Sequence, residues 1–253
     1  MYRRHLKLFL LITATVVVFS QVRNHEFVWD DDVNVYENPY LQRSTLSSVT
    51  RFWIEPYKQL YVPLPYTLWA ALAPFAERPA PDAGGIKFSP LLFHVLNLII
   101  HALSAAAAFA ILQILVRNDW AAFAGALLFA LHPVQVEPVA WVTGLKDVLA
   151  GCLSLAAIWQ YLIYAAAPAV ATKESTGGRG KRGPAESWTL SFLPGAPAFH
   201  YALATLAFVL ALFAKPSAAV APAVAWLLDR WVLMRPTKQS RMPLIACAGL
   251  WHP

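Results

Sequence analysis

Stretches of apolar residues long enough to cross a lipid bilayer recur along this 253-residue chain. A helix needs roughly 20 predominantly apolar residues to cross the hydrocarbon core. Charged residues make up only 13% of the chain, about half the share found in a typical soluble domain. The sequence therefore predicts an all-α integral membrane protein. We expect about six to seven transmembrane helices, at residues 8–22, 88–116, 120–131, 148–167, 199–214 and 217–233, with a partial seventh at 244–253.

A long polar-to-mixed segment, residues 23–88, separates the first two apolar stretches. Within it, residues 62–75 are apolar, but they are too few for a span and include three prolines. Tyr61, Tyr66 and Trp69 suit the level of the lipid headgroups. We therefore expect an outer first loop that carries short interfacial helices.

Two further segments bear on the domain organisation. Residues 168–198 contain glycines and basic residues but few bulky apolar ones, and we expect a disordered cytoplasmic loop there. The last apolar stretch, 244–253, is too short to span a bilayer. We therefore interpret residues 1–253 as one polytopic membrane domain, truncated at its C-terminus.

The basic residues predict the orientation. With the N-terminus in the cytoplasm, most of the 20 basic residues fall on the cytoplasmic side, and in the short loops only Lys146 and Lys215 do not. The first loop is then periplasmic or otherwise extracytoplasmic, in a multi-pass protein of the inner (plasma) membrane. A cleaved signal peptide is the less favoured alternative, because Val18-Phe19-Ser20 lacks a small residue at its first position. The basic residues form no single patch, which argues against nucleic-acid binding.

In this topology, ionisable residues gather on the outer face. Such groups at membrane depth are costly and by default suggest function. Adjacent carboxylates raise one another's pKa, and a carboxylate of that kind suits general-base chemistry, while lysines suit a phosphate. Each residue also has an ordinary explanation as a solvated turn, a helix stop or an ion pair. The set is Asp30, Asp31, Asp32, Glu37, His132, Glu137, Lys146, Asp147 and Lys215.

The order of short motifs along the chain resembles that of a known family. The motifs are F-V-W-D-D-D at 27–32, E-N-P-Y-L at 37–41, Y-V-P-L at 61–64, F-H-V-L-N-L at 93–98, A-L-L-F-A-L-H-P-V at 126–134, E-P-V-A-W-V-T-G at 137–144, K-D at 146–147 and A-K-P-S at 214–217. Together they resemble the membrane part of the transmembrane and tetratricopeptide-repeat proteins. These are O-mannosyltransferase-like members of the C-type glycosyltransferase superfamily. Val62 and Leu145 stand where that family usually or often has arginine.

The resemblance implies inverting transfer of a mannose-like sugar from a polyprenyl or dolichyl phosphate. The acceptor is a protein Ser or Thr hydroxyl, or another hydroxyl. The resemblance assigns catalysis to Asp30 and Asp31, and the leaving phosphate needs positive partners, for which Lys146, Lys215 and Arg51 are the candidates. The remaining candidates for substrate binding are Asp32, His132, Glu137 and Asp147. We expect no cofactor besides the lipid-linked donor, and no metal site, although the aspartates could bind a divalent ion.

Two alternatives belong to other functional classes. The chain has no room for a 34-residue helix-turn-helix repeat, so it could be a non-catalytic anchor or scaffold fragment whose tetratricopeptide repeats are missing. A small-solute transporter would show paired broken helices in two related halves. The sequence has no such internal repeat, which disfavours the transporter.

Overall fold

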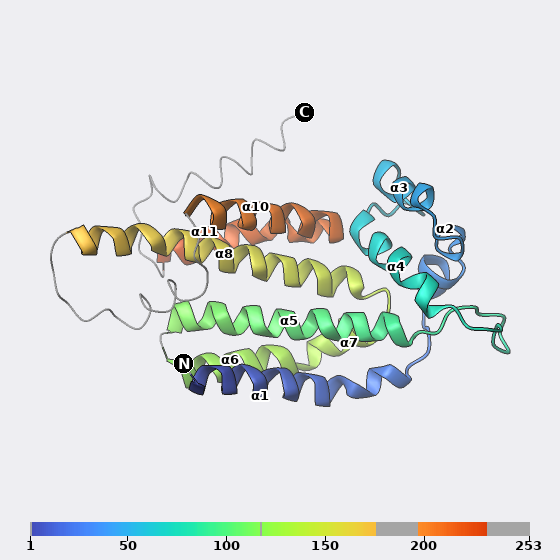
Figure 1. Ribbon diagram of the computed structural model, residues 1–253, viewed down its shortest axis with the longest axis horizontal. Coiled ribbons are helices and arrows are strands. Elements are labelled where there is room, and N and C mark those ends of the chain that lie inside the picture. The colour runs from blue at the N-terminus through green and yellow to red at the C-terminus, as the bar shows by residue number, and fades with distance from the viewer. Residues whose placement is uncertain (1, 117, 176–196, 232–253) are drawn as a thin grey trace.

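The computed structural model describes residues 2–116, 118–175 and 197–231. These residues form an elongated bundle of helices with a group of shorter helices at one end (Figure 1). No strand occurs in the described ranges, which contain only two isolated bridges, Tyr57 to Leu60 and Glu77 to Phe88. The prediction of a helical membrane protein is confirmed for this part of the chain.

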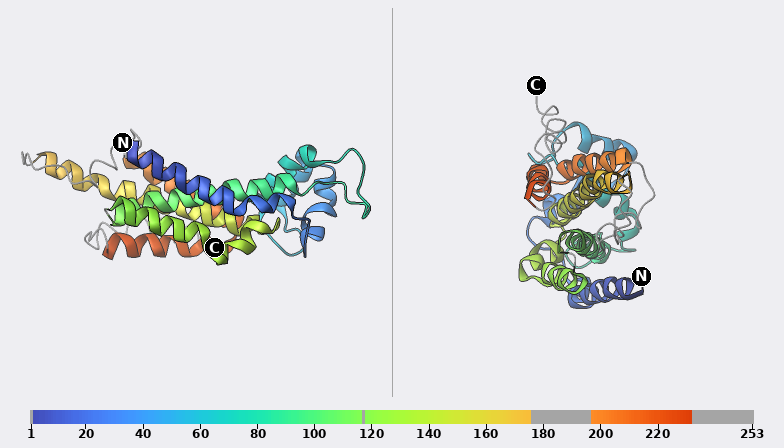
Figure 2. Two further views of the ribbon diagram at one scale, coloured as in Figure 1. Left: turned by 90° about the horizontal axis from the view of Figure 1, so that it is seen from below. Right: turned by 90° about the vertical axis from the view of Figure 1, so that its left-hand side faces the viewer.

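The bundle consists of helices that run alternately in opposite directions (Figures 1 and 2). They are α1 (Tyr2–Phe19), α5 (Leu91–Val116), α6 (Asp119–Leu131), α8 (Leu145–Ser175), α10 (Pro197–Ala214) and α11 (Ala221–Trp231). Small residues let the backbones of α5 and α6 approach closely, and Ala105, Ala122, Ala126 and Ala130 are fully buried there.

Four helices are long and apolar enough to cross a membrane: Arg4–Asn24, Leu91–Val116, Leu145–Ala166 and Pro197–Ala214. A fifth candidate is the pair Asp119–Leu131 and Pro133–Ala140, which is bent by 46°. The bend follows from Pro133, whose ring and missing N–H end α6. The predicted count of six to seven spans is therefore not confirmed.

The remaining predicted segments differ from expectation or lie outside the described residues. In place of a single span at 217–233, the structure has a 3-10 turn (Pro216–Val220) followed by the 11-residue α11. Helix α8 continues to Ser175, so the predicted disordered loop begins with helix, and α10 starts within its last residues. Residues 176–196 and 232–253, including the predicted partial seventh helix, are outside the described part.

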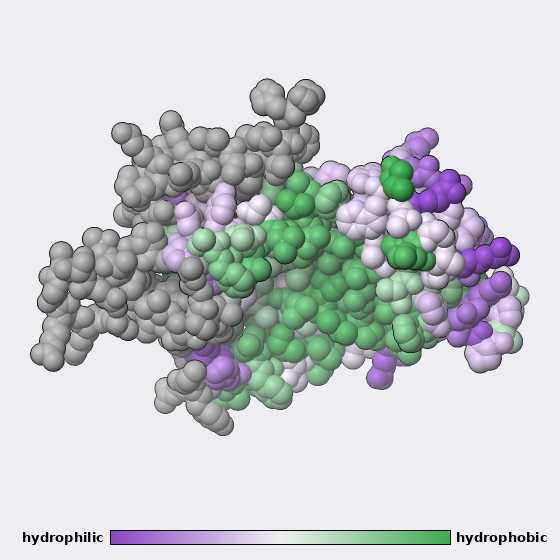
Figure 3. All heavy atoms as spheres, turned by 45° about the horizontal axis from the view of Figure 1, so that its top comes forward, coloured by the Kyte–Doolittle hydropathy of each residue, from purple (hydrophilic) through white to green (hydrophobic). Residues whose placement is uncertain are grey.

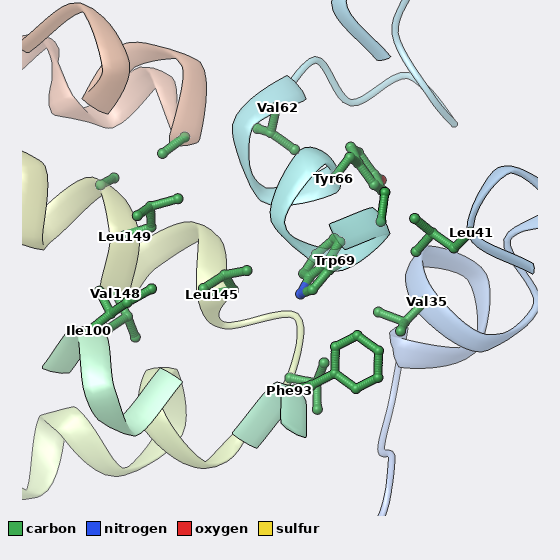
Figure 4. Close-up of a cluster of buried hydrophobic side chains, with 14 of the residues drawn as sticks. Val35, Leu41, Val62, Tyr66, Trp69, Phe93, Ile100, Leu145, Val148 and Leu149 are labelled. Carbon is green, nitrogen blue, oxygen red and sulfur yellow. The ribbon is translucent and has the colours of Figure 1, made fainter. Parts of the chain in front are cut away.

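Residues 20–90 form the group of shorter helices. We call the end of the bundle where this group lies the loop end. It contains 3-10 turn η1 (Ser20–Asn24), π-helical η2 (Asp32–Tyr36), α2 (Pro39–Gln42), α3 (Leu46–Ile54) and α4 (Pro63–Ala76). With 14 residues, α4 is too short to span a bilayer, as predicted. It packs through Tyr66 and Trp69, both 1% exposed, into a core that Leu145 and Phe93 complete (Figure 4).

The surface follows the same division. Figure 3 shows a broad hydrophobic face over the bundle and hydrophilic residues gathered at the loop end. A hydrophobic band of this kind is the surface that lipid solvates. This division of the surface fits a bundle surrounded by lipid and a loop end outside the hydrocarbon core.

Candidate functional site

A tight turn at the loop end presents the acidic motif. The Asp31 amide donates to the Val28 carbonyl (3.1 Å), so Trp29 and Asp30 occupy the two central positions of the turn. Trp29 has a φ of 51°, a left-handed conformation that a bulky residue adopts only at a cost. The Asp31 carboxylate closes the turn by accepting from the Val28 amide (2.9 Å). The turn thus points two successive aspartates in different directions.

Asp31 is fully buried and joins the first loop to a distant part of the chain. Its Oδ1 accepts hydrogen bonds from both the amide (2.8 Å) and the hydroxyl (2.5 Å) of Thr143, 112 residues away. Burial raises the pKa of the Asp31 carboxyl above its usual value, and the hydrogen bonds from Thr143 and Val28 oppose that rise. With three donors on two oxygens, Asp31 acts as a clamp between the turn and residue 143.

Two neighbours hold Thr143 in position. Asn97 on α5 donates to the carbonyl of Trp141 (2.7 Å) and, over a longer distance, to that of Pro138 (3.4 Å). Gly144 allows the chain to double back, because a Cβ there would lie 2.5 Å from the Pro138 carbonyl oxygen and 2.9 Å from that of Trp141. Only glycine fits this close backbone approach.

Asp30, in contrast, is exposed and interacts electrostatically with Lys146 at the start of α8. Its carboxylate is the strongest electrostatic partner of the Lys146 ammonium, which also interacts with Asp147, Asp31 and Lys215. Lys215, directly after α10, forms an ion pair with Asp147. The Lys146 ammonium also lies 5.7 Å from the ring centre of Trp141. Five predicted site residues are thus brought together, from the first loop, α8 and the end of α10.

Buried polar contacts of Asn34 hold the first loop next to Asp30. Asn34 donates to the Asp30 carbonyl (2.8 Å) and accepts from the Tyr66 hydroxyl of α4 (2.7 Å). Burial raises the pKa of Tyr66 above its usual value, which keeps the hydroxyl protonated as the donor. The turn is therefore fixed from α4 as well as from Thr143.

Four predicted residues, Arg51, His132, Glu137 and Asp32, are not part of this charge group. Arg51 pairs with Glu55 (2.6 Å), the residue that follows α3, and lines a surface cavity of about 300 Å³ with Tyr40, Phe52 and Tyr57. His132 accepts from the Val134 amide (3.2 Å) and so caps the turn after α6, which is its ordinary structural explanation.

Glu137 is exposed in α7 (Val136–Ala140), and no side-chain partner is described for it. Asp32 accepts from the Val33 amide (2.6 Å) at the start of η2. In the described ranges, no group of three or more His, Cys, Asp or Glu side chains could hold a metal ion.

Thr143, Asn97 and Trp29 were not among the residues predicted for the site. Each lies within a motif quoted for the family resemblance, so the motifs carried the signal. The side chains are uncharged, however, and a search for ionisable groups passes over them. Their roles depend on contacts between segments far apart in sequence, which only the fold supplies.

The fold and the site define a helical membrane protein with an acid–lysine group at the loop end of its bundle. Among curated proteins, the sequence of this chain is similar to those of protein O-mannosyl-transferases. TMTC1 of Homo sapiens is 39% identical over 74 residues, 29% of this chain and 8% of that protein. TMTC1 of Mus musculus is 31% identical over 157 residues, 60% of this chain and 16% of that protein. Tmtc1 of Drosophila melanogaster is 29% identical over 140 residues, 54% of this chain and 16% of that protein.

The aligned segments cover no more than 16% of the length of these relatives. No family model matches the chain, and no solved structure matches it.

Proposed function

We propose that this chain is the membrane part of a glycosyltransferase that moves a mannose-like sugar from a polyprenyl-phosphate donor to a hydroxyl of a protein acceptor. The observation that carries the proposal is the exposed Asp30 carboxylate, which interacts electrostatically with Lys146 at a loop end that also holds the Asp147–Lys215 pair. The names of the similar proteins support the same reaction class. The loop end faces the extracytoplasmic side in this proposal.

Asp30 is the proposed general base, and Asp31 is the residue that positions it. A general base needs a free lone pair within reach of the acceptor proton. The buried Asp31 carboxylate already accepts three hydrogen bonds, whereas Asp30 is exposed. This distinction refines the sequence-based assignment of catalysis to both aspartates.

The lysines supply the charge that the leaving group requires. The acceptor oxygen forms a bond to the anomeric carbon as the bond from that carbon to the phosphate oxygen breaks, with inversion. The acceptor proton passes to Asp30, and the electron pair of the broken bond stays on the lipid phosphate. Lys146 and Lys215 stabilise that anion, since cations are most effective where charge develops. Lys215 then exchanges its Asp147 contact for the phosphate. The reaction as proposed uses no resident metal or cofactor.

The test is sugar transfer from radiolabelled polyprenyl-phosphate mannose to a Ser/Thr-rich acceptor peptide, with the purified chain in detergent. Asp30→Asn should reduce transfer at least about 100-fold, in line with the loss of a general base. Asp82→Asn is the matched control on the same loop: its carboxylate serves Arg78 and a local turn, so transfer should be retained.

Binding of sugar-free polyprenyl phosphate provides a second measurement that does not depend on turnover. Lys146→Met together with Lys215→Met should weaken that binding, while wild-type chain binds it. If the wild-type chain neither transfers sugar nor binds the lipid phosphate, the transferase proposal is wrong and the anchor alternative is favoured.

A further inference from the structure

Trp29 combines exposure with an unfavourable backbone conformation. Its side chain is 72% exposed, although it occupies the left-handed position of the Val28–Asp31 turn. Glycine or asparagine normally takes such a position. Strain of this kind costs on the order of 1–3 kcal/mol and concentrates at functional sites. The turn therefore holds a large aromatic face out beside Asp30 at an energetic cost.

Trp141 lies against Trp29 and contributes an unused hydrogen-bond donor. The two rings meet edge to face, with centres 5.3 Å apart and planes at 85°. The Trp141 indole N–H is buried and has no hydrogen-bond partner among the described residues. Leaving such a donor unpaired costs about 1–3 kcal/mol. A ligand oxygen that reached this donor would recover that loss.

We infer that Trp29 and Trp141 form the subsite for the sugar ring of the lipid-linked donor. The inference rests on the proposed function, and it assigns the sugar and the phosphate to different residues. The C–H face of a hexose is slightly positive and packs on the negative face of an aromatic ring. A sugar on the exposed face of Trp29 lies next to Asp30, and Lys146, above the Trp141 ring, marks the adjoining phosphate position. The Trp141 indole N–H, buried in this structure, becomes the donor to one sugar hydroxyl as the ring shifts on binding.

An ordinary role for Trp29 is to anchor the loop at the headgroup level, where tryptophan is common. Two features favour the sugar subsite. A membrane anchor needs only an amphipathic side chain on an unstrained backbone. The unpaired indole N–H of the neighbouring Trp141 would serve no purpose in such an anchor. Trp29 also immediately precedes Asp30, so any group stacked on its ring is held beside the proposed base.

The experiment compares the affinities of the purified chain for two lipids of equal chain length, polyprenyl-phosphate mannose and sugar-free polyprenyl phosphate. Trp29→Leu keeps an apolar side chain but removes the aromatic face. It should weaken binding of the mannosyl lipid roughly fivefold to tenfold, the size expected for an aromatic contact. Binding of the sugar-free lipid should stay unchanged, and Trp29→Phe should restore most of the lost affinity.

Trp141→Phe keeps the ring and removes the N–H, and it should also weaken only the mannosyl lipid. Trp53→Leu is the matched control, because Trp53 is another loop tryptophan whose N–H already bonds Thr67 (2.9 Å). It should affect neither lipid. The sugar subsite would be overturned if Trp29→Leu lost the same affinity for both lipids, or if the wild-type chain bound the two lipids equally well. Either result would leave the proposed phosphate site intact. Wild-type chain that binds neither lipid would instead overturn the proposed function itself.

Discussion

Replacing Thr143 by valine tests whether the Asp31 clamp holds the loop end together. Valine has nearly the shape of threonine but lacks the hydroxyl that donates to Asp31 (2.5 Å). The backbone amide of residue 143 continues to donate (2.8 Å), so one of three hydrogen bonds is lost. Asp31 is fully buried, and water cannot replace the missing donor without a rearrangement.

The expected loss of stability is about 1.5–3 kcal/mol, the range for hydrogen bonds to charged groups. The same change should loosen the turn that presents Asp30. Activity should therefore fall in Thr143→Val even though residue 143 contacts no substrate in the proposed mechanism. Thr143→Ser, which keeps the hydroxyl, should be close to wild type in both respects.

The pH dependence of the stability difference between Thr143→Val and wild type tests the clamp more specifically than its size at one pH. Burial raises the pKa of Asp31, so the folded protein keeps a proton there at pH values where the unfolded chain has lost it. The contribution of this group to stability consequently falls as pH rises from the unfolded pKa to the folded one. The Thr143 hydrogen bond favours the ionised form, and its removal raises the pKa further. The stability difference between Thr143→Val and wild type should therefore grow with pH and reach its full size above both folded pKa values.

The measurement is the free energy of unfolding in mild detergent at a series of pH values, for wild type and the two variants. A valine variant as stable as wild type at pH 8 would refute the clamp. So would a difference that is largest at acid pH, since that would mean the hydroxyl serves the protonated form.

Two further changes test the surroundings of the site. Gly144→Ala should lower the free energy of unfolding by at least about 2 kcal/mol, because its Cβ would meet a backbone oxygen at 2.5 Å. In the same unfolding measurement in mild detergent, Gly151→Ala, whose Cβ would meet open space, should be neutral or up to about 1 kcal/mol more stable. Tyr66→Phe removes the buried hydrogen bond to Asn34 (2.7 Å) and should cost about 1–3 kcal/mol; an unchanged unfolding midpoint would show that this contact does not fix the first loop.

The sequence predicts the spanning helices well where the apolar stretch is long and unbroken. Leu91–Val116 is an example, since both length and composition point to a membrane crossing. The prediction is weaker at residues 120–131, where the stretch is short and ends at His132-Pro133. Composition does not reveal that the chain bends there by 46° and continues as a second short helix.

The site is predicted only in part, for a different reason. Counting charges on one face finds Asp30, Lys146 and Lys215, but it treats Asp30 and Asp31 as equivalent. Their difference comes from Thr143, which makes one aspartate buried and hydrogen-bonded while the other stays exposed. Charge counting also does not reveal local ion pairs: the Arg51 guanidinium pairs with Glu55, the residue that follows α3.

The bond between Asp31 and Thr143 also fixes a parity for the polypeptide. Two residues that touch lie on the same side of the bilayer, so the chain between them crosses it an even number of times. Helix α5 is the candidate for one crossing, and α4 is too short for another. If α5 crosses, the return falls to the bent pair of α6 and α7, since neither of these two helices is long enough alone. The contact between Asp31 and Thr143 thus ties the crossing of α5 to the crossing of the bent pair.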